Sequence, residues 1–132
     1  MPLDAKCNPN IVTTQSKHER ACEMAKLALA VWKADPAKFA EMDAWLFENQ
    51  TPDYKEARRH AVALVGADAL AEAESGVAVD AAIRQSVRAY GHAGRGAIPK
   101  LMLPQVTVPG RVDNVPAFYA LLEKELGLKA VE

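Results

Sequence analysis

The chain has 132 residues, enough for one domain with a substantial core. Half of the residues are apolar, a quarter are charged and the formal net charge is -1, which is ordinary for a globular protein. The absence of a basic excess or a basic stripe argues against a nucleic-acid partner and against charge-driven membrane binding. No apolar stretch approaches the ~18–20 residues that a membrane span requires.

The first fourteen residues predict an extended, loop-like segment, because they carry two prolines and the turn-prone Asn8-Pro9-Asn10. They have neither the basic n-region nor the apolar h-region of a signal peptide. If Met1 is the native start, the protein is expected in the cytoplasm. A fragment of a longer protein that begins at this residue would show the same sequence features.

Three helix-start signals follow in chain order. Ser16 and Glu19 fit a capping box, which predicts a helix from Ser16. Asp35-Pro36 should stop that helix and start the next one, with Asp35 as N-cap. Residues 51–53, Thr-Pro-Asp, are a start signal of the same kind, and this third helix should end at Gly66.

Two more helical stretches are expected, at about residues 68–74 and 79–90. Val79, Ile83 and Val87 would form the buried face of the longer one. Gly91, Gly94 and Gly96 should end it. These glycines do not make a phosphate loop, because they precede a predicted strand instead of lying between a strand and a helix.

The pattern then changes to short apolar and β-branched runs at residues 100–103 and 106–108, which predict a β-hairpin. Asp113 or Asn114 should cap a closing helix that ends at Gly127. Its expected buried stripe is Phe118, Leu121, Leu122 and Leu126. A hairpin alone is marginally stable, so it needs further strands or a helical cover.

The order of helices, Ile98-Pro99, hairpin and closing helix resembles the C-terminal half of the thioredoxin fold. Residues 38–48, KFAEMDAWLFE, look like part of the helical insertion of the DsbA-like branch. Pro2-Leu3, the Cys7-Asn8-Pro9 run and residues 18–22, HERAC, resemble a variant found in thioredoxin domains fused to vitamin K epoxide reductase-like membrane domains.

This resemblance implies an α/β fold: a partial thioredoxin-like domain over residues 1–132, incomplete at its N-terminus. Residues 16–90 would be the helical insertion, and residues 97–128 would be the cis-proline loop, hairpin and C-terminal helix. Ile98 and Pro99 would be substrate-binding, since the family's cis-proline faces its redox site. A cis X-Pro bond is accessible, and the bend leaves backbone groups free to pair with an extended peptide.

The family's first strand, its CxxC motif and the helix after that motif are missing from the sequence. Cys7 and Cys22 are fifteen positions apart, so neither has the partner that such chemistry needs. No residue is therefore expected to be catalytic. The leading hypothesis is a segment of a thiol-disulfide oxidoreductase that binds thiol or disulfide substrates, with redox cysteines supplied from elsewhere. By resemblance, its partners would be a protein substrate or a membrane redox protein, in the periplasm or cell envelope.

Alternatives stay open at this point. Cys7 and Cys22 could form a structural disulfide, as the resemblance favours, or be two free thiols. A zinc site with His18 lacks a fourth ligand, so no metal and no cofactor is predicted. The chain could instead be a non-catalytic interaction or dimerisation domain, including a homo-oligomer, or an unrelated small α+β protein. Five side chains could form either a partner-binding face or part of the core: Phe39, Met42, Trp45, Leu46 and Phe47.

Overall fold

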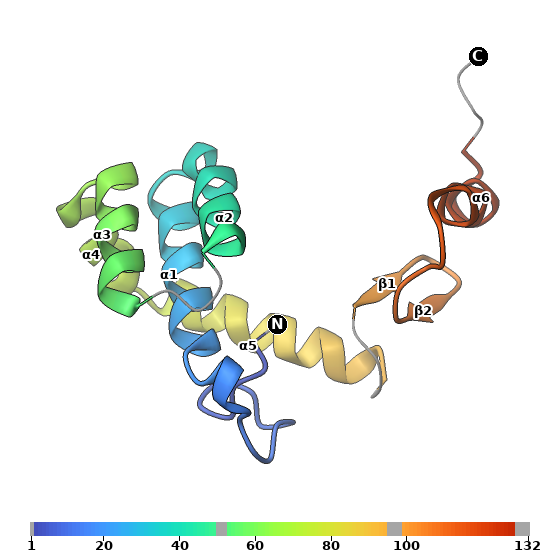
Figure 1. Ribbon diagram of the computed structural model, residues 1–132, viewed down its shortest axis with the longest axis horizontal. Coiled ribbons are helices and arrows are strands. Elements are labelled where there is room, and N and C mark those ends of the chain that lie inside the picture. Colours follow the sequence, from blue (N-terminus) through green and yellow to red (C-terminus); the bar gives the residue numbers. More distant parts are fainter. Residues whose placement is uncertain (1, 50–52, 95–98, 129–132) are drawn as a thin grey trace. The chain divides into compact units, whose positions relative to one another are not determined.

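The computed structural model describes residues 2–49, 53–94 and 99–128. It divides the chain into two compact units, Met1–Ala89 and Tyr90–Glu132, which we call the helical unit and the hairpin–helix unit (Figure 1). The described residues form mainly helices with one small antiparallel sheet, so a mixed class of helices and strands is confirmed. The thioredoxin-like arrangement stays a prediction. Within the described ranges, no helix is both long and apolar enough to pass through a membrane.

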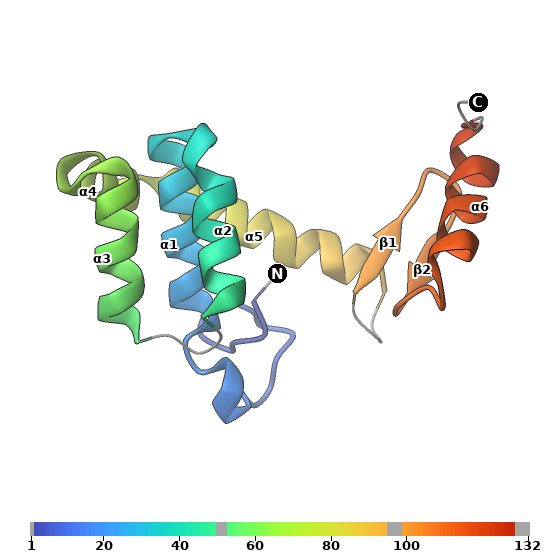
Figure 2. The same cartoon turned by 45° about the horizontal axis from the view of Figure 1, so that its top comes forward.

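Helix α1 (Ala21–Ala34) is the centre of the helical unit. It contacts α2 (Phe39–Glu48), α3 (Tyr54–Val65) and α4 (Ala67–Ser75), and Figure 2 shows α2 and α3 on either side of it. Alanines at several of the contact positions allow the helices to approach closely, and larger side chains fill the remaining space. The buried core comprises Leu27, Ala28, Ala30, Val31, Met42, Ala57, Ala61, Leu70, Ala73 and Val79.

The expected start of the first helix is wrong. Ser16–His18 forms only a short 3-10 turn, and α1 begins five residues after Ser16, at Ala21. The capping position, Arg20, makes no side-chain hydrogen bond to the helix. The carboxylate of Asp4 acts in its place, because its Oδ2 accepts the Cys22 N–H at 3.4 Å. The cap therefore comes from a residue far away in the sequence.

The next two start signals are confirmed where the structure describes them. Asp35 accepts the Ala37 N–H at 3.0 Å and begins the 3-10 turn Pro36–Lys38, which leads into α2. Asp53 accepts the Lys55 N–H at 3.4 Å at the start of α3. The other two residues of that signal, at positions 51–52, lie outside the described residues. Gly66 ends α3 with φ 84°, in the left-handed region that favours glycine.

Helix α5 (Val77–His92) is longer than expected at both ends. Its predicted buried face is confirmed, because Val79, Ile83 and Val87 are all buried. Gly91 does not end the helix but lies within it. The helix ends at His92, and Gly94 follows with a φ of +80°. Gly96 lies outside the described residues.

An ion pair joins α1 to α5. Lys26 Nζ lies 2.7 Å from Asp80 Oδ1, and this hydrogen bond and the lysine charge lower the pKa of Asp80 below its ordinary 3.8. A lowered pKa in the folded state stabilises the protein above the unfolded-state pKa, and this contribution is lost as the pH falls through the folded-state value.

We expect Asp80→Asn to make the free energy of unfolding depend less on pH below about pH 4. At neutral pH the substitution should lower the free energy of unfolding by about 0.5 kcal/mol or less, because both side chains are exposed. Urea unfolding of both proteins across that pH range measures this.

The hairpin–helix unit follows the expected order. β1 (Lys100–Met102) pairs antiparallel with β2 (Thr107–Pro109), with Leu101 opposite Val108. Of the two capping candidates, Asn114 caps α6 (Val115–Leu126), and its side chain accepts the Ala117 N–H at 2.9 Å. Gly127 ends the helix with φ 64°, as predicted.

The predicted buried stripe of the closing helix is wrong. None of the described residues from 90 to 128 is buried. Phe118, Leu121 and Leu122 are half-buried, and Leu126 is 43% exposed. The physical reason is size, because one helix and a two-stranded sheet are too few elements to enclose side chains on all sides. This unit has apolar residues on its surface that nothing in its own described residues covers.

Candidate functional site

Pro99 lies directly before β1 and is exposed. Its carbonyl oxygen accepts the Gly110 N–H at 2.8 Å, which closes the hairpin at the end away from its turn. Gly110 has φ 83°, so glycine suits this bend between β2 and α6. The second predicted substrate-binding residue, Ile98, lies outside the described residues, and so does the Ile98–Pro99 peptide bond.

A pocket of about 630 Å³ lies beside Pro99. The start of β1, the bend after β2 and the first turn of α6 all contribute to its lining. Apolar side chains predominate in this lining, which suits an apolar side chain of a bound segment. The residues that give this character are Pro99, Leu101, Val112, Val115 and Phe118.

The side chain of Lys100 connects the start of β1 to residues at the end of α5. Its ammonium group donates to the carbonyl oxygen of Ala93 at 3.2 Å and to that of Gly94. It also lies over the ring of Tyr90, 4.6 Å from the ring centroid, in a cation–π contact. These contacts hold the residue that follows Pro99 against the segment that ends α5. Sequence analysis missed this role, because a lysine in a short strand gives no local signal for it.

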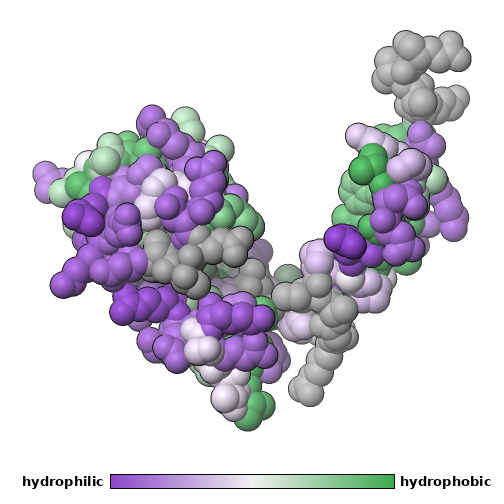
Figure 3. Space-filling view, in the orientation of Figure 1, coloured by the Kyte–Doolittle hydropathy of each residue, from purple (hydrophilic) through white to green (hydrophobic). Residues whose placement is uncertain are grey.

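The two-stranded sheet has open edges. Each described strand pairs only with the other, so the outer backbone groups of β1 and of β2 have no strand beside them among the described residues. Apolar side chains gather over the same unit, as the green surface around α6 shows (Figure 3). Met102, Val115 and Tyr119 are 56%, 65% and 60% exposed. Such an edge is a ready template for another strand.

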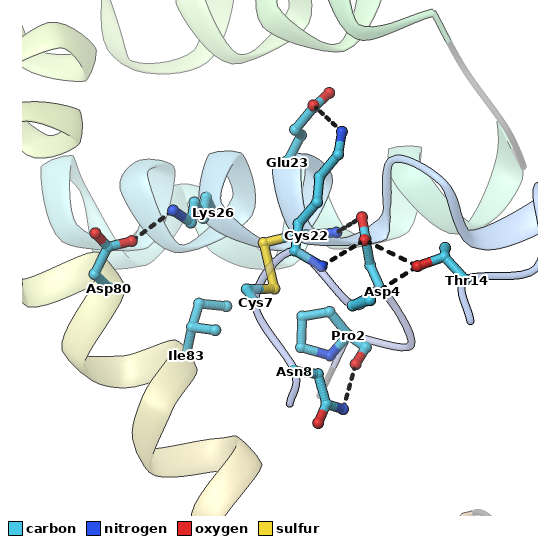
Figure 4. The surroundings of a disulfide bond; sticks show 12 residues. Pro2, Asp4, Cys7, Asn8, Thr14, Cys22, Glu23, Lys26, Asp80 and Ile83 are labelled. Atoms are coloured by element: carbon cyan, nitrogen blue, oxygen red, sulfur yellow. Dashed lines mark hydrogen bonds and ion pairs between the residues drawn. A yellow bond between two sulfur atoms is a disulfide. The ribbon is translucent and has the colours of Figure 1, made fainter. Parts of the chain in front are cut away.

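The structure joins Cys7 to Cys22 by a disulfide, with the Cα atoms 6.0 Å apart (Figure 4). These are the two cysteines of the chain, so neither is a free thiol. Cys22 is 4% exposed, at the start of α1, and Cys7 is half-buried in the N-terminal segment, residues 2–14. His18 does not join them in a metal site: within the described residues, no group of three or more His, Cys, Asp and Glu side chains could hold an ion.

Buried polar residues hold the N-terminal segment beside the disulfide. Asp4 and Asn8 are 1% and 0% exposed. Asp4 Oδ1 accepts the Lys6 N–H at 3.0 Å. It also accepts the Thr14 hydroxyl at 3.3 Å, as Figure 4 shows. Asn8 donates from Nδ2 to the Pro2 carbonyl oxygen at 2.9 Å. Sequence analysis missed these residues, because an extended segment gave no sign of being packed.

Of the five α2 residues that could form core or a partner-binding face, four lie in the core or against it and one does not. Met42 is completely buried, and Phe39, Trp45 and Leu46 pack against the core. The Trp45 ring stacks on His60 of α3 with 4.7 Å between centroids. Phe47 is 71% exposed and is therefore not part of the core.

Charged groups of α3 and α4 form an ion pair. Glu74 pairs with Arg58 at 2.9 Å. Burial raises the pKa of the Tyr54 hydroxyl above 10.0, the negative charge of Glu74 adds to this, and Arg58 opposes it. A phenol that is harder to ionise stays neutral at physiological pH.

Comparison with known proteins finds no match: no family model, no curated protein and no solved structure resembles the chain closely enough. The DsbA-like resemblance therefore rests on the residues quoted for it.

Proposed function

We propose that the chain is the substrate-contacting part of a DsbA-like thiol-disulfide exchange protein, with the redox cysteines supplied by sequence outside this chain. In this proposal the hairpin–helix unit receives an extended segment of a protein substrate beside Pro99. The single observation that carries it is the position of Pro99: directly before the first strand of an open-edged hairpin, next to an apolar pocket. Strand addition at such an edge binds a peptide through its backbone, and a pocket then selects its side chain.

Two further features support the proposal. Proline, strand, strand and helix follow the helical unit in the order that the family resemblance implies. Both cysteines are held in the disulfide, so any thiol that exchanges with a substrate must come from another segment. In this proposal the chain contributes the binding surface, and the other segment contributes the exchanging thiols.

A labelled peptide tests the binding surface directly. We expect a fluorescein-labelled, extended peptide with one reduced cysteine and apolar neighbours to bind saturably, as measured by fluorescence anisotropy. Pro99→Ala should weaken binding about tenfold, equivalent to about 1.4 kcal/mol, because it removes the fixed bend beside the pocket. Pro104→Ala is the matched control, because this exposed proline lies in the turn between the strands and away from the pocket lining.

Equal affinity of the two proline variants, or no binding by the unaltered protein, would contradict the proposal.

The second candidate function is a non-catalytic dimerisation domain, which the exposed side chains Met102, Val115 and Tyr119 favour. Sedimentation distinguishes the two: a concentration-dependent dimer that does not bind the peptide supports dimerisation.

A further inference from the structure

The two cysteines of the Cys7–Cys22 disulfide differ in how exposed they are to an attacking thiol. Cys7 is half-buried in the N-terminal segment, whereas Cys22 is 4% exposed in the first turn of α1. An attacking sulfur therefore reaches Cys7 first, and Cys22 is the sulfur that must leave.

Reduction by a dithiol then follows a defined course. A thiolate of the dithiol bonds to Cys7 Sγ, the disulfide bond breaks, and Cys22 Sγ leaves with the electron pair. The second sulfur of the dithiol loses its proton to solvent and bonds to the first, which releases Cys7 as a thiolate. The dithiol is oxidised by two electrons to a cyclic disulfide, and the two cysteine sulfurs take up protons.

The speed of the first step depends on how well Cys22 carries a negative charge, because a more stable thiolate leaves faster. A position in the first turn of a helix normally stabilises a thiolate, through the free N–H groups and the helix dipole. Here the Cys22 N–H donates to the carboxylate of Asp4, at 3.4 Å. A second anion at the same helix end is repelled, and the repulsion is strong because Asp4 is 1% exposed.

We propose that Asp4 protects the Cys7–Cys22 disulfide from thiol-disulfide exchange by occupying the N-terminus of α1 with its own negative charge. Asp4 acts through Cys22 and is a positioning residue, held in place by Lys6 and Thr14. The inference does not depend on the function proposed above, because it concerns the response of the disulfide to any dithiol. A protein that works among exchanging thiols would need such a protected structural disulfide.

Asp4→Asn tests this, because it keeps the shape and one oxygen acceptor but removes the charge. We expect dithiothreitol to reduce the variant about fivefold faster than the unaltered protein at neutral pH, a rate increase set by the better leaving group. Samples are quenched with acid, the dithiol is removed by gel filtration, and the thiols of the protein are then counted at neutral pH with a chromogenic disulfide. Thr14→Val is the matched control: it removes the hydrogen bond that the Thr14 hydroxyl donates to Asp4, 3.3 Å long, and the one that it accepts from the Ala5 N–H, 2.8 Å long, but leaves the charge of Asp4. Its rate should therefore stay close to that of the unaltered protein.

Loosening of the N-terminal segment would also speed reduction, and a second readout separates the two causes. In Cys7→Ser, Cys22 is a single thiol, and the pH at which its alkylation by iodoacetamide is half-maximal reports its ionisation. Adding Asp4→Asn should lower this pH midpoint. An unchanged midpoint, or a Thr14→Val rate as fast as that of Asp4→Asn, would overturn the proposal. Asp4→Ser serves as the neutral variant if Asp4→Asn loses its helical circular dichroism signal.

Discussion

Reduction of the Cys7–Cys22 disulfide is expected to lower the free energy of unfolding of the helical unit by about 3 kcal/mol. The bond closes a loop with a sequence separation of 15, and cross-linking a loop of that length removes about this much conformational entropy from the unfolded chain. It also ties the N-terminal segment to α1, the helix that α2, α3 and α4 contact. Urea unfolding followed by circular dichroism, with and without a phosphine reductant, measures the difference.

The double variant Cys7→Ser/Cys22→Ser supplies the control for this measurement. It should be as unstable as the reduced protein and should not respond to the reductant. If the reduced protein instead keeps the stability of the oxidised one, the buried hydrogen bonds of Asp4 and Asn8 hold the segment without help from the disulfide.

Met42→Ala is expected to destabilise the helical unit by about 3 kcal/mol, within the range for truncating a fully buried methionine. Met42 is 0% exposed and belongs to the core in which α1, α2, α3 and α4 meet. Removing its side chain leaves a cavity that the surrounding helices can only partly fill. Thermal and urea unfolding of the variant provide the value.

Phe47→Ala is the matched control on the same helix. Phenylalanine is the larger side chain, but Phe47 is 71% exposed, so its truncation should change the stability by about 0.5 kcal/mol or less. A large loss at Phe47, or a negligible loss at Met42, would show that the helices pack differently from the structure described above.

Local sequence signals predicted the helix boundaries that depend on neighbouring residues. Asp35 and Asn114 each cap a helix through a backbone N–H two or three residues away, and Gly66 ends α3 with its own backbone conformation. Both partners of each interaction lie within a few residues of each other, so the local sequence is enough to predict it. The same holds for Val79, Ile83 and Val87, whose spacing defines one face of α5.

Features that depend on distant residues could not be predicted in this way. The Ser16 and Glu19 pattern suited a capping box, but α1 starts at Ala21 because Asp4 reaches its first turn from the N-terminal segment. The periodicity of α6 indicated an apolar face and gave no information on what covers it. Within the candidate site, Pro99 came from the family resemblance, whereas the contacts of Lys100 depend on the folded chain.

The cap that Asp4 provides also affects the order of folding. Asp4 and Cys22 are separated by 18 positions, so the first turn of α1 gains its cap only after the N-terminal segment has folded back against it. Contacts between distant residues form late, because a loop must close before they stabilise anything. The central helix should therefore grow from its C-terminal half toward its N-terminus, with its first turn the last part to become ordered.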